Sequence, residues 1–302
     1  MNIICIGEAM AELRLKDGAI AHGYAGDIFN AAVYLRRLLP PGHEVHFVSR
    51  VGTDSFSQAF LALMADEGID AAQIDRDPDR NIGIYLVSTD AQGERSFEYW
   101  RSQSAARQMF DRGAPQLETQ PGDIVFLSAI TLAVISPTAR LRLMDWLQAL
   151  RAQGVLVAFD SNYRPRLWAN ADEARQAISA LWAITDIALP SVDDEMALFG
   201  ERDEDAVLAR FRAAGHLTGA LKRGAKGPLG LGQAAGAEGD FRPASKVVDT
   251  TAAGDSFDAG FLAAFAQGAS PAACLMGGHK MASEVIGWPG AIIPRAEWVA
   301  PA

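Results

Sequence analysis

The chain has 302 residues, of which 49% are hydrophobic, and it carries a formal net charge of −10 with a pI near 5.0. This acidic balance argues against nucleic acid or an anionic membrane as a partner. Its only cysteines, Cys5 and Cys274, argue against a disulfide framework or a structural zinc site. The start lacks the basic region of a signal peptide, and no apolar run has the length of a membrane span. We therefore expect a cytoplasmic protein with an α/β core.

The first third of the chain predicts alternating strands and helices. The unbroken apolar run Ile3–Ile6 predicts a strand that is buried on both faces. Helical spacing of apolar residues predicts a helix over residues 27–39. A second strand is expected over 45–51, followed by a helix over 55–66 for which Thr53 is the expected cap.

A hairpin interrupts this rhythm. Residues 84–87 and 95–100 predict two paired strands, with residues 90–93 (Asp-Ala-Gln-Gly) as their turn. The segment 11–15 alternates polar and apolar residues, so we expect it to join the hairpin in a small sheet outside the core.

From residue 123 onward the alternation of strands and helices is regular, which predicts right-handed βαβ units and a mainly parallel sheet covered by helices. The expected strands are 124–127, 156–159, 187–189, 220–222, 229–232 and 247–249, and the expected helices are 137–150, 173–183, one after Asp255, and 271–286.

The most informative segment is Asp249–Asp255, which lies between a pair of valines and a helical pattern with Phe257, Phe261 and Phe265 on one face. Its small residues allow close approach of a ligand to the backbone, and the first N–H groups of the following helix suit a phosphate. Asp255 stands at the same point. An anion-binding helix start beside a carboxylate base fits phosphoryl transfer to an alcohol, whereas the simpler interpretation is that Asp255 caps the helix.

This segment resembles the C-terminal signature D-T-T-G-A-G-D of the ribokinase-like (PfkB) carbohydrate kinases, with Ala252 in place of the first glycine. Ala is small enough for close approach unless the position requires a positive φ angle. Three further segments resemble family motifs, namely residues 26–30, 50–56 and 221–227. The resemblance implies a single ribokinase-like domain over residues 1–302. It would be a three-layer α/β/α fold with a mainly parallel central sheet and a small β lid formed by residues from about 9–25 and 83–101.

The resemblance also assigns roles at the donor side. Asp255 is the expected general base, and the backbone N–H groups of Ala252, Ala253 and Gly254 are expected to bind the transferred phosphoryl group. The expected ATP-binding residues are Lys222, Arg223, Gly224, Ala225, Lys226, Gly227 and His279. By its pattern alone, the loop that begins at Lys222 is also typical of a basic surface turn.

Metal ions are implied by the same resemblance. Asp194 and Glu195 are expected to organise Mg²⁺ through water, although acidic residues at a helix start are routine. Asp249 and Thr251 are candidates for a monovalent cation site, such as one for K⁺.

On the acceptor side, the small sheet and two strand ends carry the candidate residues. They are Gly26, Asp27, Asn30, Tyr85, Tyr99, Arg101, Asn162 and Arg164. Arginine binds carboxylates bidentately, so Arg101 and Arg164 in an acidic protein favour a sugar acid over a neutral sugar.

Four segments most resemble the family members that act on keto-deoxy sugar acids: residues 7–10, 99–101, 160–168 and 290–295. The implied activity is ATP-dependent phosphorylation of 2-keto-3-deoxygluconate at O6. The alternatives are a neutral-sugar kinase such as a fructokinase, a kinase of the galactonate epimer, and a sugar-binding regulator without turnover. A homo-oligomer formed through the lid strands is also expected, because edge strands can pair with another subunit.

Overall fold

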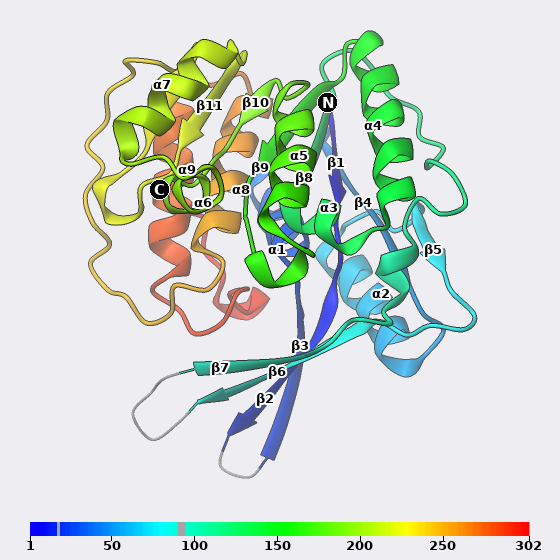
Figure 1. Cartoon of the computed structure of the whole chain (residues 1–302). Coiled ribbons are helices and arrows are strands. Elements are labelled where there is room, and N and C mark those ends of the chain that lie inside the picture. Colours follow the sequence, from blue (N-terminus) through cyan, green and yellow to red (C-terminus); the bar gives the residue numbers. More distant parts are fainter. Residues whose placement is uncertain (17–18, 90–94, 302) are drawn as a thin grey trace.

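The computed structural model describes residues 1–16, 19–89 and 95–301, and its main feature is an eight-stranded sheet with the order β12-β11-β10-β9-β8-β1-β4-β5 (Figure 1). Neighbouring strands are parallel, except that β12 is antiparallel to β11. The predicted α/β class and mainly parallel sheet are thus confirmed. The strands are β1 (Asn2–Ile6), β4 (Glu44–Val51), β5 (Ile74–Arg76), β8 (Ile124–Ser128), β9 (Leu156–Asp160), β10 (Ile187–Ala188), β11 (Thr218–Leu221) and β12 (Leu229–Gly232).

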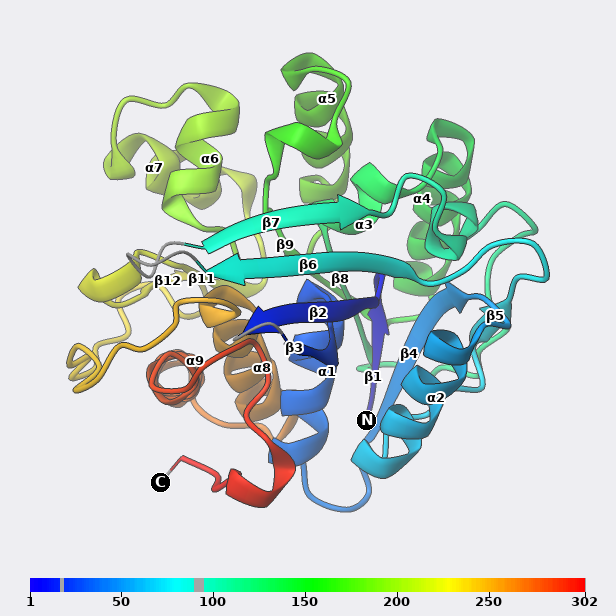
Figure 2. The ribbon, with the colours of Figure 1, turned by 90° about the horizontal axis from the view of Figure 1, so that it is seen from below.

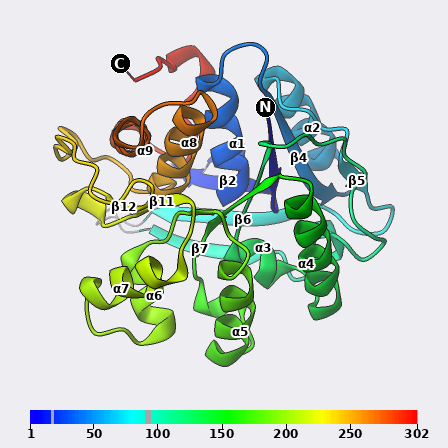
Figure 3. The same ribbon diagram turned by 90° about the horizontal axis from the view of Figure 1, so that it is seen from above.

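Helices cover both faces of this sheet, which gives three layers (Figure 3). The side chains of β1 need this cover on both faces, because they alternate between them. Ile3 and Cys5 belong to one hydrophobic core, and Ile4 and Ile6 belong to the other. None of the helices in the described ranges is long and apolar enough to cross a membrane. One face carries α1 (Asp27–Leu38), α2 (Ser55–Glu67), α8 (Ala253–Ala266) and α9 (Pro271–Val285), and the other carries α3 (Ala129–Val134), α4 (Pro137–Ala152), α5 (Ala171–Trp182), α6 (Val192–Phe199) and α7 (Glu204–Ala214).

A second sheet of four strands stands at the end of the core where β1 ends, and it runs across that end in Figure 2. Its order is β3-β2-β6-β7, with β2 and β6 parallel and the other pairs antiparallel. The predicted hairpin is therefore present, whereas its predicted turn at 90–93 lies outside the described residues. The strands are β2 (Met10–Lys16), β3 (Ala19–Ala25), β6 (Gly83–Thr89) and β7 (Arg95–Trp100).

Two local predictions are wrong. Residues 247–249 do not form a strand: Val247 and Val248 are 61% and 44% exposed, and the Val248 N–H donates to the carbonyl of Ile286 just after α9. Two β-branched residues in sequence are thus not enough to form a strand here. Thr53 does not cap α2, because Asp54 is the N-cap and its side chain accepts the Ser57 N–H at 3.0 Å.

Candidate active site

The starts of α1 and α8 lie side by side and bring two carboxylates together. Asp27 is in the first turn of α1 and Asp255 in the first turn of α8. They are linked through Asn30, whose Nδ2 donates to Asp255 Oδ2 at 2.8 Å. This hydrogen bond joins the acceptor-side motif to the C-terminal signature, although Asn30 and Asp255 are 225 positions apart in the sequence.

Asp27 is held from the opposite side by the ends of two sheet strands. Its Oδ2 accepts hydrogen bonds from the hydroxyl of Ser128, at the end of β8, and from Asn162 Nδ2 at 2.9 Å. Asn162 follows β9 and adopts a positive φ of 26°. Burial raises the pKa of Asp27, and the two donors partly offset this increase.

Asp255 has a proton affinity suited to a base. Burial and the nearby Asp27 carboxylate raise its pKa to about 7, while Asn30 and the more distant Lys222 act in the opposite direction. A general base works best when its pKa lies near the working pH. Asp27 and Asp255 thus form a pair of half-buried carboxyl groups with raised pKa values at the starts of α1 and α8.

Ala252 stands where the family signature has a glycine, and its backbone conformation shows whether this position requires a positive φ angle. It adopts the left-handed conformation, with φ 62° and ψ 16°, as the residue that precedes α8. The position therefore does call for a positive φ, and alanine occupies it at a conformational cost. In the predicted anion site, the N–H of Ala253 already donates to the carbonyl of Thr250 at 3.2 Å. The first N–H groups of a helix have no acceptor within the helix, so the N–H of Gly254 is better placed than that of Ala253 to bind an anion.

Lys222 differs from most residues of its loop because its side chain is buried and paired with two aspartates. It follows β11, is 8% exposed, and its Nζ lies 2.9 Å from Asp160 Oδ2 and 2.9 Å from Asp258 Oδ1. Burial lowers the pKa of Lys222, but the two aspartates outweigh burial and raise the pKa above its usual value. Asp160 and Asp258 were missed in the sequence, although an acidic residue on the otherwise buried, apolar helix α8 is a signal of a buried cationic partner.

Gly224, Ala225 and Lys226 of this loop are exposed, whereas Arg223 is half-buried and Gly227 is buried. Arg223 Nη1 donates to Glu204 at 2.7 Å, and Lys226 Nζ reaches the same carboxylate at 3.3 Å. Gly224 and Gly227 have positive φ angles of 56° and 76°, and Ala225 lies in the short 3₁₀ helix between them. On α9, His279 Nε2 contacts the carbonyl of Arg242 at 2.7 Å and its ring packs edge-on against Phe241. His279 also lines a cavity of about 440 Å³.

The small sheet contributes two aromatic rings, and Arg101 directly follows its strand β7. Tyr85 and Tyr99 are directly opposite each other on β6 and β7, and their rings stack at 5.7 Å. Arg101 donates to the buried carboxylate of Glu8, which also accepts a hydrogen bond from Ser104 Oγ at 2.6 Å. Arg101 is thus paired with an acidic residue from the segment between β1 and β2, a contact that the sequence did not predict.

The second arginine is also paired. Arg164 Nη1 donates to the carbonyl of Tyr163 and, at 3.2 Å, to Asp194 Oδ1. A guanidinium carries five N–H donors, and the Arg164 side chain is 52% exposed, so donors remain for an external carboxylate. Burial raises the pKa of Asp194, and Arg164 partly offsets the increase.

Glu195 and Asp249, the other acidic candidates for binding a metal ion, are both buried and bound to protein groups. Glu195 is fully buried and forms an ion pair with Arg210 at 2.7 Å, although burial still raises its pKa to about 7. Asp249 is buried and accepts the N–H groups of Thr251 at 3.0 Å and of Gly290 at 2.5 Å. Within the described residues, no group of three or more His, Cys, Asp or Glu side chains is arranged to hold a metal ion.

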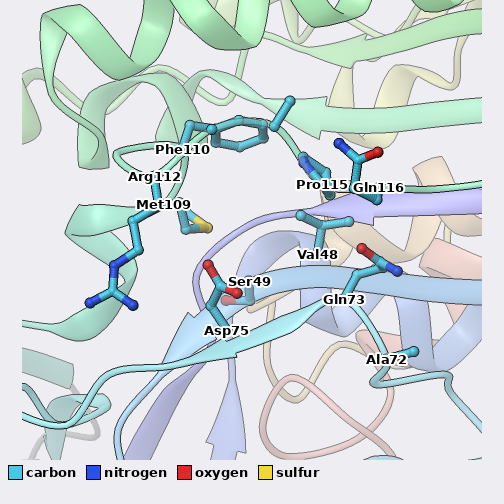
Figure 4. A pocket seen from close by; sticks show the side chains of 12 residues that line it. Val48, Ser49, Ala72, Gln73, Asp75, Met109, Phe110, Arg112, Pro115 and Gln116 are labelled. Carbon is cyan, nitrogen blue, oxygen red and sulfur yellow. The ribbon is translucent and has the colours of Figure 1, made fainter.

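A different pocket of about 350 Å³ lies at the β4–β5 edge of the large sheet (Figure 4). Its wall includes Val48, Asp75 and Phe110, and none of the predicted site residues lines it. The polar cluster between α1 and α8 therefore remains the candidate active site.

A three-layer α/β/α core whose helix starts and strand ends converge on paired carboxylates, with a small sheet standing at the same end, defines a ribokinase-like sugar kinase. The chain belongs to the pfkB family of carbohydrate kinases, whose model matches residues 1–298. It is 43% identical over 302 residues to 2-dehydro-3-deoxygluconokinase of Dickeya dadantii and 42% identical over 304 residues to that of Escherichia coli K12, with 97% of each chain covered.

Solved structures agree with this assignment. The PfkB protein from Polaromonas sp. JS666 has a TM-score of 0.78 and 28% identity, covering 95% of this chain and 96% of that chain. Aminoimidazole riboside kinase from Salmonella enterica, complexed with aminoimidazole riboside and an ATP analogue, has a TM-score of 0.82 at 24% identity and covers 97% of this chain and 95% of that chain. The second likeness is an argument for the fold alone. The chain is therefore a PfkB sugar kinase, and kinases of this family use ATP.

Proposed function

We propose that this kinase transfers the γ-phosphoryl group of ATP to O6 of 2-keto-3-deoxygluconate, giving the 6-phosphate and ADP. The observation that carries the proposal is the identity of 38–43% to four 2-dehydro-3-deoxygluconokinases, each matched over 97% of this chain. The fructokinase of Klebsiella pneumoniae is more distant, at 29% identity over 88% of this chain.

In the proposed mechanism, Asp255 accepts the proton of the O6 hydroxyl while the O6–phosphorus bond forms and the bond from phosphorus to the ADP oxygen breaks. Its near-neutral pKa supports this role. The start of α8, with Ala252, Ala253 and Gly254, stabilises the charge of the transferring group. Gly26, Asp27 and Asn30 bind acceptor hydroxyl groups together with Asn162.

Arg101 and Arg164 bind the acceptor carboxylate, and Tyr85 and Tyr99 cover the sugar from the small sheet. Arg101 already forms an ion pair with Glu8, and Arg164 with Asp194. A substrate carboxylate would therefore share each guanidinium with a protein carboxylate. This sharing suits a site that must hold an anion inside a chain of net charge −10. The two edge strands of the small sheet, β3 and β7, carry exposed apolar side chains, which supports association of two copies there.

The nucleotide side is proposed for the loop residues from Arg223 to Gly227 and for His279, whereas Lys222 at the start of the loop is buried and paired with Asp160 and Asp258. Mg²⁺ would neutralise phosphate charge. Asp194, half-buried and close to the strand ends, suits a metal that keeps most of its waters, whereas Glu195 is engaged by Arg210. A monovalent cation would be held near Asp249 and Thr251.

The test is ADP release, measured with a coupled assay across 2-keto-3-deoxygluconate, its galactonate epimer, fructose and ribose. The proposal predicts turnover of the keto-deoxy acids and very little with sugars that lack a carboxylate. Efficient turnover of fructose would favour the neutral-sugar alternative, and absence of turnover with every acceptor would favour a sugar-binding regulator.

A further inference from the structure

Three buried side chains behind the candidate active site form one charged triad. Lys222 Nζ lies 2.9 Å from Asp160 Oδ2, and 2.9 and 3.0 Å from the two oxygens of Asp258. The side chains of Lys222, Asp160 and Asp258 are 8%, 5% and 1% exposed. A buried ammonium is retained only when it is paired in this way, so the triad fixes the ends of β9 and β11 to helix α8.

Hydrogen bonds and helix α8 connect the triad to Asp27 and to Asp255. Asp160 Oδ1 accepts the N–H of Asn162 at 3.1 Å, and Asn162 Nδ2 in turn donates to Asp27. On the other side, Asp258 lies one helical turn after Asp255. The Asn30–Asp255 hydrogen bond then returns to α1. These contacts make a closed ring that contains the proposed base and the proposed acceptor ligand.

We propose that Lys222 is a positioning residue for phosphoryl transfer: from its place between Asp160 and Asp258 it fixes the start of α8 and offsets the negative charge around Asp255. This role rests on the proposed function and differs from direct binding of ATP, which the family resemblance implied for Lys222. Its Nζ lies 3.7 Å from the position that a Cβ would take on Gly254, so the ammonium sits directly behind the proposed anion site.

The charges around Asp255 explain why one lysine matters. Asp27 and Tyr34 act on it from α1, Asp160 from the end of β9, and Lys222 from just after β11, while Asp258 follows it by three residues on α8. Asp194 on α6 faces the same Lys222 and Asp160, and also Arg164. Lys222 lowers the pKa of three of these carboxyl groups: Asp194, Asp255 and Asp258.

Both partners in the triad affect the pKa of Asp258. Burial raises its pKa well above the usual value, and a hydrogen bond with Asp160 raises it further even though Lys222 opposes the shift. Removal of the lysine charge makes the surroundings of Asp255 more negative, so Asp255 should hold its proton to higher pH.

The experiment is the pH profile of kcat at saturating ATP for the wild type and Lys222→Met. It uses whichever acceptor the wild type phosphorylates best. A neutral-sugar result would therefore refute the proposed substrate and leave this test intact. We expect the acidic limb of Lys222→Met to move to higher pH by about one unit, as for loss of a nearby opposite charge, with activity recovering at alkaline pH. The KM for ATP should stay within about twofold, because the ammonium is not the nucleotide ligand.

Matched variants separate this role from loss of packing. Asp258→Asn keeps the charge of Lys222, so its acidic limb should not move to higher pH, whatever the effect of this variant on kcat. Lys246→Met, at an exposed position, should leave the profile unchanged. If Lys222→Met does not fold, Lys222→Gln keeps a hydrogen-bond donor without the charge and should show the same shift. An unmoved acidic limb in the neutral variant, or a raised KM for ATP with unchanged kcat, would overturn the proposal.

Discussion

The left-handed conformation of Ala252 yields a stability prediction that is independent of catalysis. A residue with a Cβ at φ 62° is disfavoured by about 1–2 kcal/mol, and glycine at the same position is not. Ala252→Gly also loses a half-buried methyl group and adds about 0.4–1 kcal/mol of unfolded-state entropy. The net gain in the free energy of unfolding is therefore small when this variant is considered alone.

Ala253→Gly is the matched control. Ala253 is equally half-buried, but it is the first helical residue of α8 and has no positive φ. Both substitutions lose the same methyl group and gain the same freedom in the unfolded chain, so the difference between them isolates the strain. We expect Ala252→Gly to be the more stable by about 1–2 kcal/mol, measured by urea unfolding, with a Tm higher by a few degrees. Equal stabilities would refute the argument that this position requires a positive φ.

The site makes further predictions. Asp255→Asn should lower kcat by at least about 10²-fold while ATP binding is kept, and near-normal turnover would rule out this base. Because the folded protein raises the pKa of Asp255 to about 7, the ionised form opposes folding, so the same variant should gain thermal stability over the wild type as pH rises from about 4 through 7. Acceptor binding should slow amide hydrogen exchange in β6 and β7 more than in α4, and equal protection would exclude a ligand-gated lid. Arg164→Lys should raise the KM for the keto-acid by roughly tenfold or more, from about 1.5–3 kcal/mol for a charged hydrogen bond. It should leave the KM for ATP and for an analogue reduced at the carboxylate nearly unchanged.

Local patterns in the sequence were enough to predict most of the sheet. The unbroken apolar run at Ile3–Ile6 is a strand with alternate residues in two cores, and the aromatic stripe from Phe257 is the buried face of α8. The short edge strand β5 and the helix α7 were not predicted, because a three-residue strand and a largely exposed helix leave little periodic signal.

The charge pairing of the site was out of reach of the sequence. Arg101 was expected to face an acceptor, yet its partner Glu8 lies 93 residues earlier in the chain. The same holds for Arg164 and Asp194, which are 30 residues apart and meet only where strands β9 and β10 end side by side. Motif spacing indicates which residues belong to the candidate site, whereas the fold determines which of them form ion pairs with one another.

The central claim is tested most directly by the product itself. The purified chain, incubated with ATP, Mg²⁺ and 2-keto-3-deoxygluconate, should release one ADP per phosphate ester formed. ³¹P and ¹³C NMR should place that ester on O6, and Asp255→Asn should form almost none in the same time. An ester at another position, or no ester from the keto-acid while fructose is phosphorylated efficiently, would contradict the account.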